Sequence, residues 1–335
     1  SDVILNLVEP PKHDLRLFVD NMGSYSTGEV REGVIYQNGS LLGLRDTLGL
    51  NYTHAAGDDG YGLNYALPIN TWGTRLAGAY NRDKTLIRYG PFRDLHITGV
   101  AEAYGADIRH PLYFDSKSYL EGSIGVRKRQ VTSWISGARL QETSTEDKHL
   151  GLEWQAVDSM GFWSASLSYI SGNADFSGGK ESHYALTRGT LRRVQNIGDG
   201  WSIQGKVSFQ ATKDVLLPSS EQFLIGGEGS VRGYQTGLYS GDTGRIVSAE
   251  LHHPLPFSFD SAKLSGYVFI DHGIAKPYRP VGSSRGPDEI NGAGYGLNLS
   301  VGKRVSAKVS LGLPLRERAE EKRDYYVTAQ VMVAV

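Results

Sequence analysis

Apolar and polar residues alternate along most of the chain. In the clearest run, the odd positions include Trp201, Ile203, Val207 and Phe209, and the even positions are Ser202, Gln204, Lys206, Ser208, Gln210 and Thr212. Because successive side chains of a β-strand point to opposite faces, this period of two predicts a strand with one apolar and one polar face. Such a strand fits lipid on one side and a water-filled lumen on the other.

The same alternation recurs from end to end and predicts an all-β fold. We expect strands near residues 13–22, 29–38, 44–55, 60–69, 73–86, 94–109, 117–134, 144–157, 161–173, 183–195, 201–213, 245–255, 262–275, 291–302, 304–314 and 324–335. They are typical of a transmembrane antiparallel β-barrel of about 16 strands with both termini in the periplasm. A soluble β-sandwich or jelly roll also alternates, but its strands are usually only about five to six residues long.

Turn residues separate these strands. We expect turns at Asn38-Gly39, Asp58-Asp59-Gly60, Ser159-Met160-Gly161 and Gly198-Asp199-Gly200, because Gly, Asn and Asp tolerate the backbone conformations that tight turns require. No linker divides the chain, so residues 13–335 are expected to form one barrel domain.

Composition narrows the possible functions. The chain has 335 residues, no Cys and a formal net charge of −1. The lack of Cys excludes disulfides and thiolate metal sites, and the near-zero charge gives no sign of a nucleic-acid partner, which would require a basic surface. No run approaches the roughly 18 apolar residues of a membrane helix.

Two short motifs carry the candidate chemistry. Val231-Arg232-Gly233-Tyr234 lies in a Gly-rich segment, residues 216–243, and Phe269-Ile270-Asp271-His272-Gly273 lies on an alternating strand. The guanidinium of Arg is a planar fork of donors that matches a carboxylate. Since Leu264, Val268 and Ile270 form the apolar face of this strand, we expect Asp271 to point into the lumen.

An arginine on the loop could therefore meet a carboxylate on the barrel wall. Arg232 would pair with Asp271, and Glu250, on the polar face of the preceding strand, would be a second acceptor. The other interpretation is a solvated loop arginine, since a surface ion pair contributes only about 0–1 kcal/mol. The residues alone favour the solvated arginine over the anchored one.

The motifs resemble those of the barrel domain of two-partner secretion transporters, the TpsB family. The segment Ile225-Gly226-Gly227-Glu228-Gly229-Ser230-Val231-Arg232-Gly233-Tyr234 is similar to the family's VRGY loop, and Phe269-Ile270-Asp271-His272-Gly273 to its F-x-D-x-G wall motif. Asp20-Asn21-Met22-Gly23 and Thr27-Gly28 also resemble its opening strand pair. Relatives of the family include the barrel-assembly insertase of the bacterial outer membrane.

This resemblance implies a function and a set of functional residues. It implies an outer-membrane pore that exports a large secreted exoprotein without ATP or a cofactor, with the loop folded into the lumen and anchored there by Arg232 and Asp271. Val231, Gly233, Tyr234, Phe269 and Gly273 would support that anchor. It also implies a preceding plug helix and POTRA domains, which the sequence lacks; residues 1–12 would be the remnant of a POTRA domain or its linker.

Other functions are weighed on the same residues. Asp271-His272 and His252-His253 are adjacent on strands and point to opposite faces, so neither pair can form an acid–base or metal site. We therefore expect no catalytic residue, metal or cofactor, and a monomer surrounded by outer-membrane lipids. The alternatives are an outer-membrane protein insertase, a passive diffusion porin and, last, a barrel hydrolase. The basic residues expected in the lumen are Arg127, Lys128, Arg188, Arg192 and Lys206.

Overall fold

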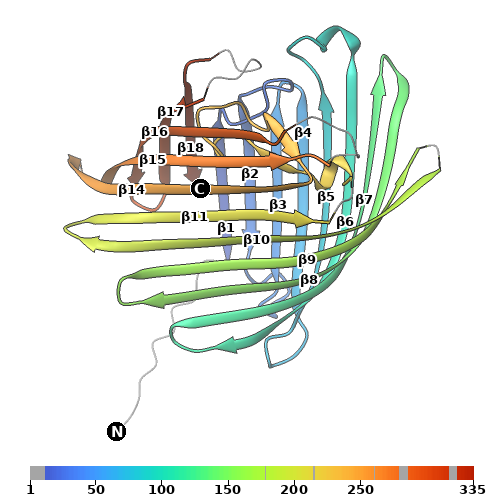
Figure 1. Cartoon of the computed structure of the whole chain (residues 1–335). Helices are drawn as coiled ribbons and strands as arrows, with labels where there is room; N and C mark the ends of the chain where they lie inside the picture. Colours follow the sequence, from blue (N-terminus) through green and yellow to red (C-terminus); the bar gives the residue numbers. More distant parts are fainter. Residues whose placement is uncertain (1–11, 178, 214–215, 260, 279–285, 317–322) are drawn as a thin grey trace.

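Sixteen antiparallel strands close into one barrel in the computed structural model (Figure 1). The structure describes residues 12–177, 179–213, 216–259, 261–278, 286–316 and 323–335. The barrel strands are β1 His13–Asp20, β2 Arg31–Asn38, β3 Thr47–Ala55, β4 Asp58–Pro68, β5 Arg75–Leu86, β6 Ile97–Phe114, β7 Ser118–Ile135, β8 Ala138–Asp158, β9 Gly161–Phe176, β10 Lys180–Gly198, β11 Trp201–Thr212, β14 Thr243–Phe259, β15 Ala262–Lys276, β16 Asp288–Val301, β17 Val305–Pro314 and β18 Tyr326–Ala334. The fold class and the strand number predicted from alternation are confirmed.

Each barrel strand pairs with its neighbours in sequence order, and β1 pairs with β18 to close the ring. This closing pair runs from Arg16↔Ala334 to Asp20↔Gln330. Strand length varies around the ring, from 8 residues in β1 to 21 in β8. The long strands β6 to β10 therefore extend one side of the barrel beyond the other (Figure 1).

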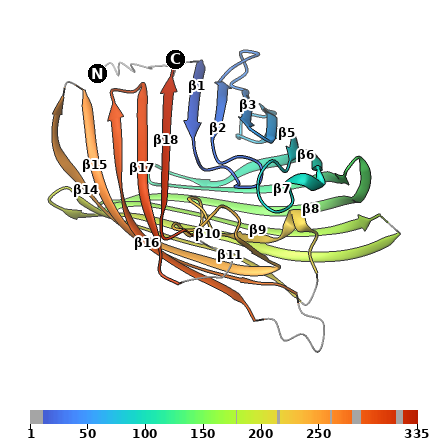
Figure 2. The same cartoon turned by 90° about the horizontal axis from the view of Figure 1, so that it is seen from above.

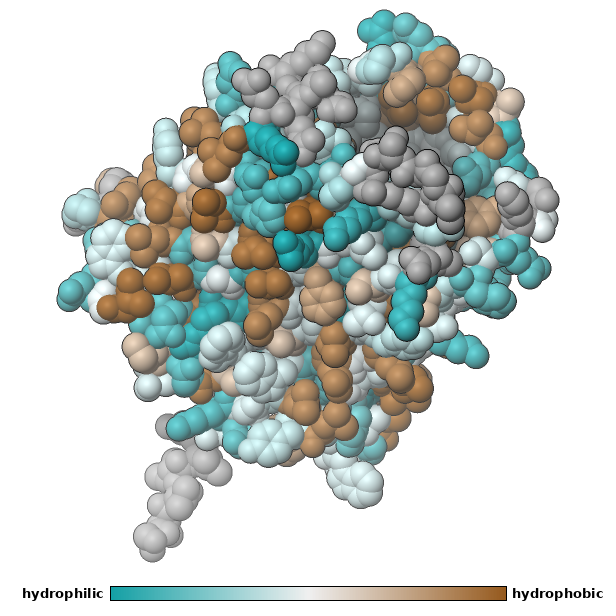
Figure 3. Space-filling model, viewed as in Figure 1, coloured by the Kyte–Doolittle hydropathy of each residue, from teal (hydrophilic) through white to brown (hydrophobic). Residues whose placement is uncertain are grey.

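The two faces of β15 show how the alternation is used. Val268 and Ile270 point outward and are 54% and 57% exposed, whereas Phe269 and Asp271 point inward and are 5% and 1% exposed. Trp201, Val207 and Phe209 on β11 also lie on the outer face, as predicted. In the space-filling view, apolar side chains gather in rows along the strands of the visible face, with polar side chains between them (Figure 3). Outward apolar rows are what lipid contact requires.

Two local predictions are wrong. Asp58, Asp59 and Gly60 do not form a turn but begin β4, because the hairpin closes earlier, with Ala55 opposite Asp58. Lys128 does not line the lumen: it lies beside exposed Glu146 with a 2.7 Å ion pair, while its neighbour Arg127 contacts buried Asp147. Adjacent residues of one strand cannot both face inward.

Residues 216–242, between β11 and β14, lie inside the ring of strands (Figure 2). This segment contains a short 3₁₀ helix, η2 (Ser219–Glu221), and two short paired strands, β12 (Phe223–Ile225) and β13 (Tyr239–Gly241), which the alternation does not predict. Its apolar residues pack on the inner wall; the buried cluster is Ile225, Val231, Tyr234, Tyr239, Ile246, Ala275 and Ile290. We call this segment the lumen loop.

The expected remnant at residues 1–12 lies, except for Lys12, outside the described residues. In the part of the chain that the structure describes, no helix is both long and apolar enough to cross a membrane.

Candidate functional site

A tight turn in the lumen loop presents Arg232 to the barrel wall. Gly226 and Gly227 have φ values of +106° and +93°, a region that side chains other than glycine rarely adopt. The turn is closed by the Gly227 N–H, which donates to the Val231 carbonyl at 3.0 Å, and by the Ser230 N–H, which donates to the Gly227 carbonyl at 3.0 Å. The chain then leaves the turn at Arg232, directed at β15.

Arg232 contacts Asp271 with three donors. Its Nε donates to Oδ2 at 2.7 Å, its Nη2 donates to Oδ1 at 2.8 Å, and its backbone N–H donates to Oδ2 at 3.1 Å. The arginine side chain is 5% exposed and the aspartate side chain 0% exposed. This is a two-pronged, water-excluded pair of the kind that fixes geometry as well as charge.

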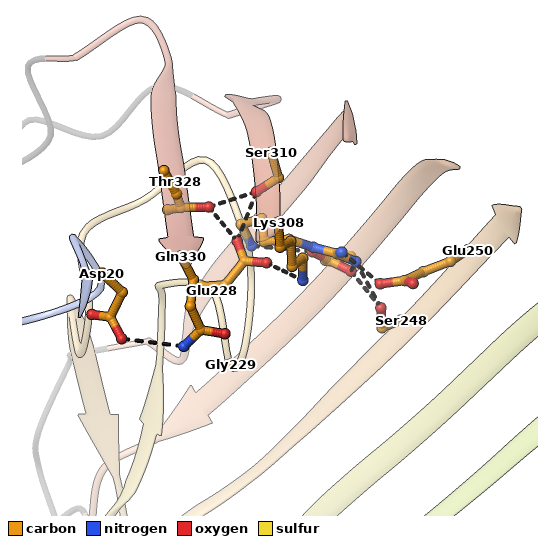
Figure 4. A network of polar contacts seen from close by, with 12 residues as sticks. Asp20, Glu228, Gly229, Ser248, Glu250, Lys308, Ser310, Thr328 and Gln330 are labelled. Carbon is orange, nitrogen blue, oxygen red and sulfur yellow. Dashed lines mark hydrogen bonds and ion pairs between the residues drawn. The ribbon is translucent and has the colours of Figure 1, made fainter. Parts of the chain in front are cut away.

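Further groups complete the surroundings of the guanidinium. Nη1 donates to Glu250 Oε1 at 2.5 Å, and Nη2 donates to Ser248 Oγ at 3.1 Å. Ser248 in turn donates to Asp271 Oδ1 at 2.6 Å (Figure 4). The ring of Phe269 lies against the guanidinium, with Cζ 3.6 Å from the ring centroid, in the geometry of a cation–π contact.

The charges at this site favour the ion pair. One guanidinium faces two carboxylates, and Glu250 has a second partner in His252 Nε2, 2.7 Å away. Removing water from charged groups costs several kcal/mol, a cost offset only when partners and hydrogen bonds are complete. Loss of Arg232 would leave both carboxylates without their main partner, so the loop is held more firmly than a surface pair could hold it.

Two glycines let the loop approach the wall. Gly233 has a φ of +93°, and a Cβ there would lie 2.7 Å from the backbone carbon of Leu313 on β17. Gly273 faces Val231: a Cβ at Gly273 would lie 2.6 Å from Val231 Cγ2. At Gly233 the obstacle is backbone, so this position needs glycine for the loop to pack on β17, whereas at Gly273 the Val231 side chain occupies the space that a Cβ would fill.

Tyr234 anchors the far side of the turn. Its ring is 2% exposed. Its hydroxyl lies 2.8 Å from the carbonyl of Asn291 on β16 and 3.1 Å from the carbonyl of Arg316, which follows β17. A buried tyrosine whose hydroxyl reaches backbone carbonyls fixes both packing and orientation.

The structure thus brings the residues of the two motifs together. Arg232 meets Asp271, Glu250 and Phe269, Val231 meets Gly273, and Tyr234 packs beside them on β16; their part in transport stays a prediction. Sequence reasoning missed Ser248, although alternation two residues before Glu250 places it on the inner face. It also missed Glu228, because a loop has no periodicity that assigns a side chain to a partner.

The histidines near the site, His252 and His272, contact Glu250 and Asn291. Among the described residues, no group of three or more His, Asp or Glu is arranged to hold a metal ion. His272 Nδ1 lies 2.6 Å from Asn291 Oδ1, away from the Arg232–Asp271 contact. Its neighbour Asp271 is engaged by Arg232 and Ser248 on the other face.

Comparison with known proteins shows the family to which the chain is similar. Residues 1–299 match the family model described as haemolysin secretion/activation protein ShlB/FhaC/HecB. The chain is 24% identical over 340 residues to the heme/hemopexin transporter protein HuxB of Haemophilus influenzae (strain 86-028NP), covering 94% of this chain and 59% of HuxB. The chain therefore spans about three fifths of the length of that curated relative.

Solved structures share the fold. CdiB from Escherichia coli superposes with a TM-score of 0.84 at 19% identity, covering 98% of this chain and 64% of CdiB. BamA from Haemophilus ducreyi lacking POTRA domains 1–3 gives a TM-score of 0.68 at 15% identity, covering 98% of this chain and 71% of that one. At these identities the likeness shows the barrel architecture.

Proposed function

Because the chain belongs to the haemolysin secretion/activation protein ShlB/FhaC/HecB family, we propose that it is a pore that exports a large secreted partner protein. The partner passes from the periplasm to the cell surface without ATP and without a bound cofactor. The observation that carries this proposal is the buried Arg232–Asp271 pair, which joins a loop inside the barrel to the barrel wall.

The sixteen-strand barrel and its family locate the chain in the bacterial outer membrane. There the apolar outer face meets lipid and the polar inner face meets water. A pore for an extended polypeptide needs a hydrated path and an obstruction that can move. The inner face supports the first requirement, since it carries polar residues on strand after strand.

The lumen loop supports the second requirement. It is attached to the wall by ion pairs, hydrogen bonds and packing rather than by a continuous sheet, so it can leave the wall while the barrel stays closed. The Arg232 anchor keeps the resting pore obstructed. Export begins when the anchor opens and the loop moves aside for the partner chain.

The remaining partners follow from the same proposal. Outer-membrane lipids surround the barrel, the protein acts as a monomer, and no nucleic acid takes part. The likeness to BamA concerns the fold and does not by itself favour an insertase.

The proposal is tested by secretion in a defined strain. The full-length protein is produced together with a candidate exoprotein, and the exoprotein is measured in the medium and in the periplasm. We expect secretion that requires the barrel protein and continues without added ATP in sealed outer-membrane vesicles. Ion conductance without any exported protein would instead indicate a diffusion porin, and insertion of other barrels would indicate an insertase.

A further inference from the structure

We propose that Glu228 is a second positioning residue of the lumen loop, which fastens it to β17 and β18 beside the closure of the barrel. This inference rests on the proposed function, because it concerns how the obstructing loop is held. Glu228 lies four positions before Arg232 in the turn, but it faces different strands.

The carboxylate of Glu228 is almost fully surrounded by partners (Figure 4). Lys308 Nζ lies 2.5 Å from Oε1, Ser310 Oγ donates to Oε2 at 2.9 Å, and Thr328 Oγ1 donates to Oε2 at 2.8 Å. The Glu228 side chain is only 9% exposed. One ammonium and two hydroxyl groups therefore donate to this buried carboxylate, in charge-assisted contacts that fix its position. These partners come from both β17 and β18.

The position of Thr328 links this anchor to the barrel closure. The β1–β18 pairing ends at Asp20↔Gln330, and Gln330 Nε2 donates to Asp20 Oδ2 at 3.3 Å. After this pair, the side chain of Asn21 makes the kind of contacts with β18 that a strand backbone would make. Its Nδ2 donates to the Val327 carbonyl at 2.8 Å, and its Oδ1 accepts from the Ala329 N–H at 2.7 Å. Thr328 lies between Val327 and Ala329 on β18, and its hydroxyl donates to Glu228 on the lumen side.

A second contact reaches the other side of the closure. Thr236 Oγ1, in the same loop, donates to the Met22 carbonyl at 3.3 Å, just after β1. The loop therefore touches β18 through Glu228 and the segment after β1 through Thr236. Both ends of the barrel sheet are therefore in contact with the lumen loop.

The Glu228 anchor and the Arg232 anchor use separate partners. Arg232 binds side chains of β14 and β15, whereas Glu228 binds side chains of β17 and β18. Opening the Arg232 contact alone leaves the loop attached at Glu228. Full release of the loop therefore requires both anchors to open, and each should contribute separately to the closed state.

The experiment measures loop release in the full-length protein through a single cysteine. The described barrel chain has no natural Cys, so a Val231→Cys change gives one buried probe, since Val231 is 0% exposed. The rate of reaction with a hydrophilic maleimide in outer-membrane preparations reports how often the loop leaves the wall. Glu228→Gln removes the charge with little change of shape, and Glu153→Gln is a control on the inner face of β8.

We expect Glu228→Gln to raise the labelling rate by about ten-fold, the change expected from weakening the charge-assisted bonds of one buried carboxylate. Glu153→Gln should leave the rate unchanged. The exchanged pair Glu228→Lys with Lys308→Glu should bring the rate back toward that of the parent. Heat-dependent migration on gels verifies that each barrel is folded.

Equal labelling of Glu228→Gln and the Glu153→Gln control would overturn the inference. So would a Glu228→Gln effect that disappears in an Arg232→Ala background, because the two residues would then act as one anchor. Secretion of the partner is scored separately. If Glu228→Gln speeds labelling but the parent protein exports no partner, the Glu228 anchor stands and the proposed function is rejected.

Discussion

The inner surface of the barrel differs between its two sides. On β14 to β18, inward residues such as Asp271 and Phe269 are covered by the lumen loop and are only 1% and 5% exposed. On β3 to β5 the inward residues are mostly glycine, alanine and amides, and Asn51, Asn64 and Asn81 are exposed. One side is specialised to hold the loop, and the other stays open to water.

Packing on the open side also has a distinct pattern. A Cβ at Gly49 would lie 2.6 Å from the Asn64 amide, and a Cβ at Gly62 would lie 2.5 Å from the amide of Asn51 and 2.7 Å from that of Asn81. The amides thus lie flat over glycines of the neighbouring strands. Glycine therefore serves two purposes in this barrel: on one wall it admits the loop, and on the other it lets polar side chains lie close to the sheet.

The largest effect should come from breaking the anchored side. Arg232→Ala and Asp271→Ala should each weaken loop attachment by about 3–5 kcal/mol, because removing one partner of a buried pair strands the other charge. Both changes should impair secretion by the full-length protein while leaving the barrel assembled, because export requires a loop that returns to its anchored position between openings. The double variant should be little worse than either single one, since the two residues act as one unit.

Arg192 provides a control for the loss of an arginine from the inner face. Arg192 lies on the inner face of β10, and the structure gives its side chain no ion pair among the described residues, so Arg192→Ala should secrete normally. Normal secretion by Arg232→Ala and Asp271→Ala, or losses that simply add, would show that the loop is held in another way.

The second-largest effect should come from placing a charge on the lipid-facing surface of the barrel instead of on its lumen-facing surface. Val268→Arg places a charge on the lipid face and should destabilise the folded barrel by about 2–4 kcal/mol at mid-depth. Gln204→Lys, on the inner face, should change stability little. Urea unfolding in lipid vesicles measures both, and equal costs for the two substitutions would contradict the assigned faces.

A smaller effect is expected where the loop approaches β17. Gly233→Ala adds a Cβ at a φ of +93° and against the backbone of Leu313, and should cost about 1–2 kcal/mol of loop attachment. Gly229→Ala is the control, since a Cβ there meets nothing within 4 Å. Conductance in planar bilayers should show more open events for the first variant only; identical records would exclude this close approach.

The smallest effect is predicted for the open side. Asn51→Ala and Asn81→Ala should change barrel stability by no more than about 0.5 kcal/mol and leave the loop in place, because neither amide contributes to a buried network. Loop labelling and urea unfolding provide the measurements. A large gain in loop release from either change would mean that the open wall also holds the loop.

The features that could be predicted from the sequence are those that impose a period of two on the side chains. The sixteen barrel strands were predictable because a closed sheet between lipid and water imposes a period of two on each. Alternation also placed Asp271, Glu250 and Phe269 on the inner face. Strand ends were less predictable: Asp58-Asp59-Gly60 has the composition of a turn, yet it begins β4.

The lumen loop shows where sequence reasoning stops. Arg232 stands out because it lies in a short motif, but Glu228 has no pattern that assigns it to Lys308 and Thr328. These partners lie 80 and 100 positions further along the chain, and only the barrel closure brings them to the loop. Contacts of this kind depend on the whole ring of strands and not on local sequence.

Locking the lumen loop to the barrel wall would show whether the loop must leave the wall for export. Cysteines at Val231 and Gly273 would join the loop to β15, because a Cβ at Gly273 lies 2.6 Å from Val231 Cγ2. The single Val231→Cys variant serves as the control. We predict that oxidation of the double variant stops partner secretion and that a reductant restores it. Undiminished secretion with the disulfide formed would show that the partner protein passes while the loop stays on the wall.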